Sequence, residues 1–449
     1  MRVNRGVART PLALRLNVNI SRPSVPRESW LMSAAKPSHP NADVRMKGFA
    51  QRATVEAAVA WLDSVLPPLG NLATEEVGLF DAAGRVLARD VTSLVNVPSF
   101  ARSMMDGFAL SGEATYGATS YNPLPLRIVG TCLPGEPFPQ TVSVGEAVRI
   151  MTGAPLPVGT DAVLPVELSE LDGEMLRVLE PVSAGKHVGQ VGEDIRSGDV
   201  VQSVGRMLRP QDIGVLSSIG VGRVEVVRRP RVRVLITGNE LLPAGTPPTG
   251  YQIADSNGPM LAALIARDGG QPILSDIIPD DPAAIRAALY AEADVVLVSG
   301  GSSVGQEDHV PKLLADEGEL AIHGVAMRPS SPTGMGRLGG RLVFLLPGNP
   351  VSCLCAYDFF AGRAIRALGG RSRDWPYRRE RVRLSRKLVS TVGRVDYARV
   401  IVRGDEAEPL AVSGASILSS TTRADGFVVV PADSEGQPPG AEVEVFMYQ

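Results

Sequence analysis

The 449-residue sequence is poor in histidine and cysteine, and it carries almost no excess of charge. It has 4 histidines and 3 cysteines, and none of them has the spacing of a zinc site. The formal net charge is -3, which gives no broad positive surface for a polyanion, so nucleic-acid binding is not favoured. The odd number of cysteines (Cys132, Cys353 and Cys355) fits reduced thiols in a cytoplasmic protein.

Long apolar runs and the common nucleotide-binding motifs are also missing. No apolar run is long enough to span a bilayer, so no membrane association is expected. The run GGSSVG at 300–305 does not fit G-x-G-x-x-G, and His187 stands where a P-loop after Gly185-Lys186 needs a hydroxyl residue. An ordinary nucleotide-dependent α/β enzyme would predict a dinucleotide motif and is disfavoured.

The first 48 residues differ from the rest of the sequence. They are rich in arginine and proline and show no sustained apolar periodicity. A mitochondrial or chloroplast transit peptide would have a similar composition. We expect instead a disordered tail, or a start codon placed upstream of a true start at Met46.

The remaining chain is too long for one hydrophobic core, and changes in its composition and apolar pattern divide it into several domains. Residues 98–185 combine proline and glycine with short valine-rich runs, which predicts a β-rich lobe. The flanking segments 49–97 and 186–229 are expected to form one discontinuous N-terminal helical or linker domain. It opens with a helix, because apolar residues from Val55 to Leu66 recur at helical spacing.

Strands and helices alternate between residues 230 and 375. Apolar strands at this spacing predict a parallel sheet with helices on both faces, that is, a doubly wound, mostly parallel α/β domain. One of its helices should begin at Asp281, a good N-cap followed by proline. Residues 376–449 return to short alternating strands and predict a small C-terminal β-domain. The expected fold class is therefore α/β plus β, in several domains.

Polar loops follow the predicted strands of the α/β domain. In open α/β sheets, ligands bind outside the carboxyl ends of the strands. The loops at these positions are Thr237–Glu240, Pro279–Asp281, Ser299–Ser303 with Asp308 behind it, Arg328–Pro332 and Pro347–Pro350. We expect these loops to meet at one rim.

The residue types at this rim suit an anion and a metal ion. Glycines let backbone N–H groups approach an anion, and the N-terminus of a following helix adds positive charge. Glu240, Asp280 and Asp308 come from separate loops and would repel one another unless a cation lay between them, and Mg²⁺ prefers such oxygen ligands. Each feature alone has an ordinary explanation as a turn, a cap or a solvated acid. Together they predict an anion and metal site.

Seven motifs give the chain, from about residue 50 onward, a family likeness. They are VPSFARSMMDGFAL at 97–110, RIMTGAPLPVGTDAV at 149–163, GEDI at 192–195, TGNEL at 237–241, DDP at 280–282, SGGSSVGQED at 299–308 and LPGNPVS at 346–352. With them the chain resembles the molybdopterin molybdenumtransferases, the MoeA and gephyrin E-domain family. The resemblance implies Mg²⁺-dependent insertion of molybdate into adenylylated molybdopterin with release of AMP, in molybdenum cofactor biosynthesis.

The same resemblance implies a cytoplasmic homodimer whose site joins the α/β domain of one subunit to the β-rich lobe of the other. Molybdopterin adenylyltransferase is a further candidate partner. The resemblance and the loop chemistry assign catalytic roles to Asp106, Thr152, Glu240, Asp280 and Asp308, and the last three are the expected metal ligands. The expected substrate contacts are Ser299, Gly300, Gly301, Ser302, Ser303, Arg328, Ser331, Pro347, Gly348, Asn349, Pro350 and Arg399. Mg²⁺ would bridge the pyrophosphate and Asp308, with molybdate near the loop 299–303.

The chain also departs from the family pattern. Family members commonly carry K-P-G-K-P where this chain has Arg328-Pro-Ser-Ser331-Pro, so the second lysine is lost. Ala101 and Arg102 replace the usual Asp-Asn, and Asn239 stands where Asp is frequent. The alternative is therefore a catalytically weakened pterin-binding or scaffold paralogue of the same fold. Retention of the three rim acids favours the enzyme, because a scaffold has no need of acids that repel one another.

Overall fold

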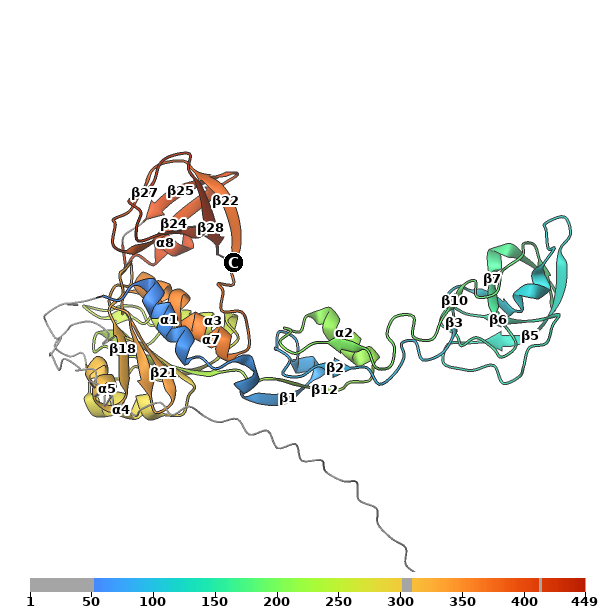
Figure 1. Cartoon of the computed structure of the whole chain (residues 1–449), viewed down its shortest axis with the longest axis horizontal. Coiled ribbons are helices and arrows are strands. Elements are labelled where there is room, and N and C mark those ends of the chain that lie inside the picture. The colour runs from blue at the N-terminus through green and yellow to red at the C-terminus, as the bar shows by residue number, and fades with distance from the viewer. Residues whose placement is uncertain (1–51, 301–308, 412–413, 449) are drawn as a thin grey trace, which may run out of the picture. The chain divides into compact units, whose positions relative to one another are not determined.

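The structure is a computed structural model that describes residues 52–448 except 301–308 and 412–413. Three six-stranded sheets organise this described part of the chain, and Figure 1 labels some of their strands. The tail predicted for residues 1–48 lies outside the described residues. None of the described helices has both the length and the apolar character that crossing a membrane requires. The predicted fold class, α/β plus β in several domains, is confirmed.

The first helix, α1 (Val55–Val65), packs with the α/β domain. Its N-cap Thr54 accepts a hydrogen bond from the backbone N–H of Ala57 at 3.1 Å. The buried side chains of α1 are spaced as the sequence predicted, and they belong to the core that also contains the β-strand residues Val232 and Val234. The expected grouping of 49–97 as one unit therefore differs from the packing, since the apolar face of α1 is covered by the α/β domain.

Two separate stretches of the chain form the domain that follows α1. The strand β1 (Thr74–Gly78) pairs antiparallel with β12 (Arg223–Val227), and β2 (Val91–Thr92) pairs with β11 (Val200–Gln202). The helix α2 (Pro210–Ser218) covers them. The shared core includes Leu87, Leu208, Leu216 and Val226. Short 3₁₀ turns lie at Leu69–Asn71 and Leu79–Asp81 in this part of the chain, and at Gly112–Thr115 and Val166–Leu168 in the β-rich lobe.

Asp212 fixes the start of α2. Its buried carboxylate accepts hydrogen bonds from the backbone N–H of Arg209 at 2.9 Å and from the guanidinium groups of Arg209 and Arg206 at 2.9 to 3.2 Å. Gln202 donates a further bond at 3.2 Å. These donors, led by Arg209, hold the pKa of Asp212 well below its ordinary value.

Asp212→Asn should lower the free energy of unfolding at pH 7 by about 1 kcal/mol, a modest value because both arginines are partly exposed to screening water. A lowered native pKa stabilises the fold above the ordinary aspartate pKa of about 3.9, and this stabilisation is lost as the pH falls below it. Urea unfolding at pH 7 and pH 3 should therefore show a difference between wild type and variant that shrinks in acid. A difference independent of pH would contradict this role.

The β-rich lobe is one sheet with the strand order β7-β4-β6-β5-β9-β8. Its strands are β4 (Gly107–Leu110), β5 (Leu124–Cys132), β6 (Glu146–Ile150), β7 (Ala162–Pro165), β8 (Ser169–Asp172) and β9 (Met175–Val178). A two-residue pair, β3 (Arg102–Ser103) with β10 (Val188–Gly189), connects the two chain segments that enter and leave the lobe. Buried cores pack against both faces of the sheet.

The α/β domain has the strand order β16-β13-β17-β21-β20-β18. Its strands are β13 (Arg231–Ile236), β16 (Gln271–Leu274), β17 (Val295–Ser299), β18 (Glu319–His323), β20 (Gly334–Leu338) and β21 (Arg341–Leu346). The first four strands in the order are parallel, β20 runs antiparallel to β21, and β18 runs antiparallel to β20 and so in the direction of the first four. The mostly parallel sheet predicted from the alternation of strands and helices is thus confirmed, with β20 as its one antiparallel strand among those described. Sequence reasoning missed β20, which forms a hairpin with β21 through Gly339 and Gly340, both at positive φ.

Helices cover both faces of this sheet. They are α3 (Asn257–Arg267), α4 (Pro282–Tyr290), α5 (His309–Glu317), α6 (Pro350–Ala356), a π-helix (Tyr357–Ala361) and α7 (Gly362–Leu368). The helices α4 and α5 share one core with alternate residues of β13, β17 and β21, whereas α1, α3, α6 and α7 share the core on the other face (Figure 1). Asp281 caps α4 by accepting a bond from the N–H of Ala284 at 2.7 Å, as predicted.

The C-terminal domain is a closed barrel. Its strands are β22 (Arg378–Leu384), β24 (Val395–Arg403), β25 (Glu406–Ala411), β26 (Gly426–Val430) and β28 (Glu442–Met447), and the pairing of β24 with β26 closes the sheet. The short strand β19 (Met327–Arg328) adds to β24 in parallel. The segment 319–328 is therefore divided between two sheets, with β18 in the α/β sheet and β19 in the barrel. Smaller elements are β23 (Leu388–Val389), β27 (Gly436–Gln437) and α8 (Ser419–Thr422).

A buried ionic cluster lies where the α/β domain packs against this barrel. Asp358, in the π-helix, accepts hydrogen bonds from the hydroxyl of Tyr377 at 2.9 Å and from Arg267 Nη2 at 3.0 Å. Arg267 also contacts Asp268, which pairs with Arg366 Nη1 at 2.9 Å. Burial raises the pKa of Asp358, so the cluster depends on these donors to offset the cost of removing a carboxylate from water.

All three cysteines of the chain are buried. Cys132 lies in the β-rich lobe, and Cys353 and Cys355 lie on α6. Burial raises the pKa of Cys353 to about 12, so this thiol stays protonated at neutral pH.

Candidate functional site

The carboxyl ends of β13, β17 and β21 open on a cavity of about 710 Å³, which we call the rim cavity. A volume of this size accommodates a cofactor-sized ligand. Its lining includes Thr237, Glu240, Asp255, Asn257, Ser299, Gly300, Pro332, Pro347, Gly348, Asn349, Pro350 and Ser416. Loops after three parallel strands therefore meet here, as the sequence predicted for them, and a loop of the C-terminal domain completes the wall.

Gly300 lets the loop after β17 approach the loop after β13 closely. Gly300 has φ +95°, and a Cβ atom on it would lie 2.3 Å from the carbonyl oxygen of Thr237, so no other residue fits without moving the backbone. Gly348 lies beside it, since a Cβ atom there would make an ordinary contact with the Cα of Gly300 at 3.8 Å. Both glycines line the rim cavity, and glycines without side chains let backbone groups come close to an anion.

Asn257 ties the loops after β17 and β21 together, and sequence reasoning missed it. Its Nδ2 donates to Ser299 Oγ at 2.9 Å and to the carbonyl of Gly348 at 2.7 Å. Asp255, two residues earlier, accepts from the N–H groups of Asn257 and Gly258 at 2.9 Å each and lines the rim cavity. The signal in the sequence was the run Ala254-Asp-Ser-Asn-Gly258, which leads into α3. It was overlooked because the strand before it, β15 (Ile253–Ala254), has only two residues.

The expected metal ligands are only partly assembled by the described residues. Glu240 lines the rim cavity, whereas Asp280 lies half-buried in the loop before α4 and is not part of the cavity wall. Asp308 falls outside the described residues, as do Gly301, Ser302 and Ser303. No group of three acidic, histidine or cysteine side chains within the described ranges is arranged to hold a metal. The ligand set Glu240, Asp280 and Asp308 stays a prediction.

A second cavity, of about 970 Å³, adjoins the rim cavity and shares Pro332, Pro347 and Asn349 with it. We call it the basic cavity, because the charged side chains in its wall are Arg52, Arg328 and Arg394. The loop 329–332 and two segments of the C-terminal domain, 391–393 and 414–415, also line this cavity.

Arg328 lines the basic cavity but already has an acidic partner. Its Nε lies 3.1 Å from Oδ1 of Asp396, and its Nη2 contacts the other carboxylate oxygen. Arg394 Nε lies 3.3 Å from the same fully buried carboxylate, and Ser390 donates to it at 2.8 Å. Two arginines thus share one negative charge. Ser331 also lines this cavity, and its buried hydroxyl has no hydrogen-bond partner among the described residues.

Arg399 is fully buried on β24 and is not among the described residues that line the rim cavity or the basic cavity, so its assignment as a substrate contact stays a prediction. The strand β24 is covered on both faces, by the barrel core on the side of Ala398 and by the core of the α/β domain on the side of Tyr397. The first six residues of the strand, from Val395 to Val400, are therefore all buried.

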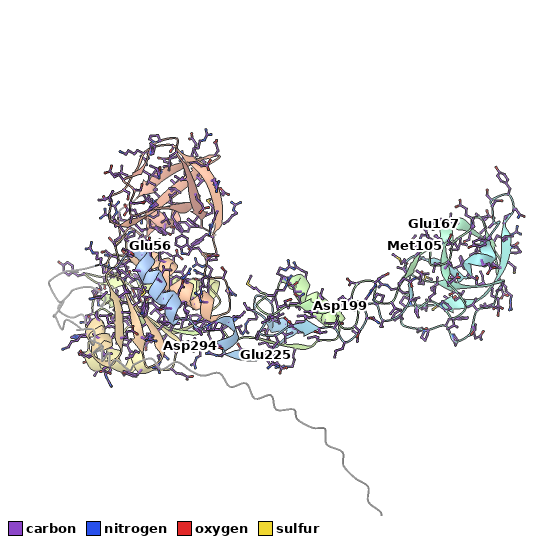
Figure 2. The ribbon with its side chains drawn as sticks, viewed as in Figure 1. Glu56, Met105, Glu167, Asp199, Glu225 and Asp294 are labelled. Atoms are coloured by element: carbon purple, nitrogen blue, oxygen red, sulfur yellow. The ribbon has the colours of Figure 1, made fainter. Side chains whose placement is uncertain are left out.

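Asp106 and Thr152 form a pair in the β-rich lobe. The backbone N–H and the hydroxyl of Thr152 both donate to Asp106 Oδ1 at 2.7 Å. These two bonds, the backbone one first, lower the pKa of the exposed Asp106 carboxyl. The neighbouring Met105, labelled in Figure 2, is exposed as well. The lobe therefore presents an ionised acid beside apolar side chains at its surface.

Thr152→Val should raise the pKa of Asp106 toward its ordinary value, because the variant keeps the backbone donor and loses the hydroxyl. Carboxyl NMR titration of Asp106 would measure the change. Thr160→Val is the matched control in the same lobe, since its hydroxyl donates to the carbonyl of Pro157 and to no carboxylate. An unchanged titration in Thr152→Val would exclude the hydroxyl from this role.

Comparisons with known proteins match the chain over most of its length. Three family profiles match the chain: the MoeA N-terminal region (domain I and II) at residues 53–220, a probable molybdopterin binding domain at 233–367 and the MoeA C-terminal region (domain IV) at 381–448. The chain is 34% identical to molybdopterin molybdenumtransferase 2 of Mycobacterium tuberculosis, over 82% of this chain and 94% of that protein. It is 31% identical to the molybdopterin molybdenumtransferase of Haemophilus influenzae, over 83% and 93%.

The structure is similar to a crystal structure of the molybdopterin biosynthesis MoeA protein of Pyrococcus horikoshii. The TM-score is 0.76 and the sequence identity is 33%, with 89% of this chain and all of that chain (100%) covered.

Proposed function

Because the chain belongs to the molybdopterin molybdenumtransferase (MoeA) family, we propose that it inserts molybdate into adenylylated molybdopterin and releases AMP in a Mg²⁺-dependent reaction. A transferase of molybdenum cofactor biosynthesis, with molybdopterin and molybdate as substrates, follows from the family itself. The adenylylated form of the pterin, the release of AMP and the metal are our proposal.

The observation that carries this proposal is the adjoining pair of cavities at the ends of parallel strands. An adenylylated pterin carries several negative charges and molybdate is a dianion, so the site must bring like charges together. The rim cavity offers close backbone at Gly300 and Gly348, and the basic cavity beside it offers arginine side chains. Preorganised donors of this kind stabilise developing negative charge better than water does.

The rim cavity also fits a magnesium ion by the chemistry of its donors. Glu240 and Asp255 line it, and the buried oxygens Asn257 Oδ1 and Thr237 Oγ1 have no hydrogen-bond partner among the described residues. Oxygen donors of this kind suit Mg²⁺ better than softer metals. Bound there, the ion would neutralise phosphate charge and polarise the phosphoryl group.

The residues of the chain have separate tasks in this proposal. Asn257 fixes the spacing of the β17 and β21 loops, so that their backbone is preorganised around the phosphates. Glu240 contributes negative charge that holds the metal at the cavity wall. Asp106, kept ionised by Thr152, is proposed to reach the site from the β-rich lobe of a second subunit in a homodimer. Molybdopterin adenylyltransferase, which would supply the adenylylated substrate, is a proposed further partner.

A second candidate function is pterin binding without efficient insertion. The observation that favours it is the engagement of Arg328 by Asp396, together with a neutral Ser331, which leaves fewer free cations in the basic cavity.

Purified protein supplied with adenylylated molybdopterin, molybdate and Mg²⁺ tests both functions. The enzyme should release AMP and form molybdenum cofactor, and EDTA should stop both. Binding of the pterin without AMP release would favour the scaffold. Light scattering coupled to size-exclusion chromatography would measure whether the protein is a dimer.

A further inference from the structure

The basic cavity has one arginine whose charge is not shared with an acid. Arg328 and Arg394 both pair with the buried Asp396, so together they leave one net positive charge. Arg52 lines the same cavity, and no acidic side chain in the described ranges forms an ion pair with it. The described residues of the cavity wall include no acidic side chain. The described groups therefore bring about two net positive charges to the cavity, half of this charge from Arg52.

Backbone pairing fixes the position of Arg52. Ala53 forms a parallel bridge with Val325, in which the N–H of Ala53 donates to Gly324 at 3.0 Å and the N–H of Ala326 donates to Ala53 at 2.8 Å. The segment that contains Ser331 lies beside residues 324–326 as well, because the N–H of Val325 donates to the carbonyl of Ser331 at 2.9 Å. Three chain segments thus lie side by side, and the outer two contribute Arg52 and Ser331 to one cavity.

We propose that Arg52 is an oxyanion-binding residue of the basic cavity. It holds a tetrahedral dianion, either molybdate or the phosphate oxygens of the pterin substrate, together with the net charge of the Arg328, Arg394 and Asp396 cluster. The guanidinium fork donates two parallel hydrogen bonds to such an oxyanion, which a lysine does less well. The identity of the dianion rests on the proposed function, whereas its charge and shape rest on the cavity.

Titration calorimetry on the full chain, with molybdate alone and with inorganic phosphate alone, tests this assignment. Arg52→Ala should weaken binding by about tenfold, the effect expected for losing a charge-assisted hydrogen bond. Arg52→Lys should lose less. Adding Ser331→Lys to Arg52→Ala should recover much of the affinity, because it returns a positive charge to the neighbouring segment of the same cavity. Arg403→Ala, an exposed position at the end of β24, is the control and should bind as the wild type does.

The two probes separate the sources of the dianion. Weaker binding of molybdate only, or of phosphate only, identifies which one Arg52 holds, and weaker binding of both supports the shared chemistry. Unchanged affinity in Arg52→Ala, or no binding of either anion by the wild type, would overturn the inference. If the wild type binds the anions through Arg52 but releases no AMP, the proposed function fails and the assignment of Arg52 remains.

Discussion

Glu240→Gln is expected to lower the turnover of molybdate insertion by about a hundredfold or more, with the fold unchanged. Glu240 lines the rim cavity together with Gly300 and Gly348, and both the metal and the phosphates are proposed to lie in this cavity. Glutamine keeps the size of the side chain and removes its charge. Removal of one group that stabilises charge in a transition state typically costs about two to three orders of magnitude in rate. AMP release measured at saturating substrate would report this loss.

The matched control is Glu292→Gln, an exposed acid of the same domain that pairs with Arg231. Its turnover should equal that of the wild type, and both variants should keep the wild-type thermal midpoint. Raising the Mg²⁺ concentration should partly restore Glu240→Gln if the carboxylate holds the ion. Full activity without added metal would remove Glu240 from the metal site.

Asp358→Ala is expected to lower the free energy of unfolding by about 3 kcal/mol, because it leaves a buried arginine with one acidic partner fewer. Asp358 is fully buried and accepts bonds from Tyr377 and Arg267, while in the variant Arg267 keeps Asp268 as its acidic partner and its bond to the hydroxyl of Tyr377. Urea unfolding at neutral pH measures the change.

The control for this substitution is Asp405→Ala, at an exposed turn of the C-terminal barrel, which should change the stability by less than about 0.5 kcal/mol. Tyr377→Phe removes one neutral donor to Asp358 and should cost about 1 kcal/mol. If Asp358→Ala were as stable as the wild type, the cluster would not hold the α/β domain and the barrel together.

Local signals in the sequence predicted much of the α/β domain. Asp281 followed by proline marks the start of α4, and the apolar runs of β13, β17 and β21 give the strands whose ends form the rim cavity. These features depend on residues close together in the chain, so their chemistry is visible without the fold.

Features that depend on distant segments could not be predicted in the same way. The helix α1 shows its apolar face in the sequence, but not which domain covers that face. Arg328 looked free to bind an anion, and only the fold brings Asp396 beside it. Asp255 and Asn257 follow a strand of two residues, which gives no periodic signal. In the first two cases the fold supplies a partner from a distant segment, and in the third the strand is too short to be recognised.

The burial of all three native thiols makes this protein suitable for measuring how its domains move during a reaction cycle. Maleimide dyes need an accessible thiolate, and Cys132, Cys353 and Cys355 offer none. Two cysteines engineered on the surface, one in the β-rich lobe and one in the α/β domain, could then be labelled without altering the native sequence elsewhere. Single-molecule energy transfer between the dyes would follow the approach of one domain to the other as molybdate and pterin are added.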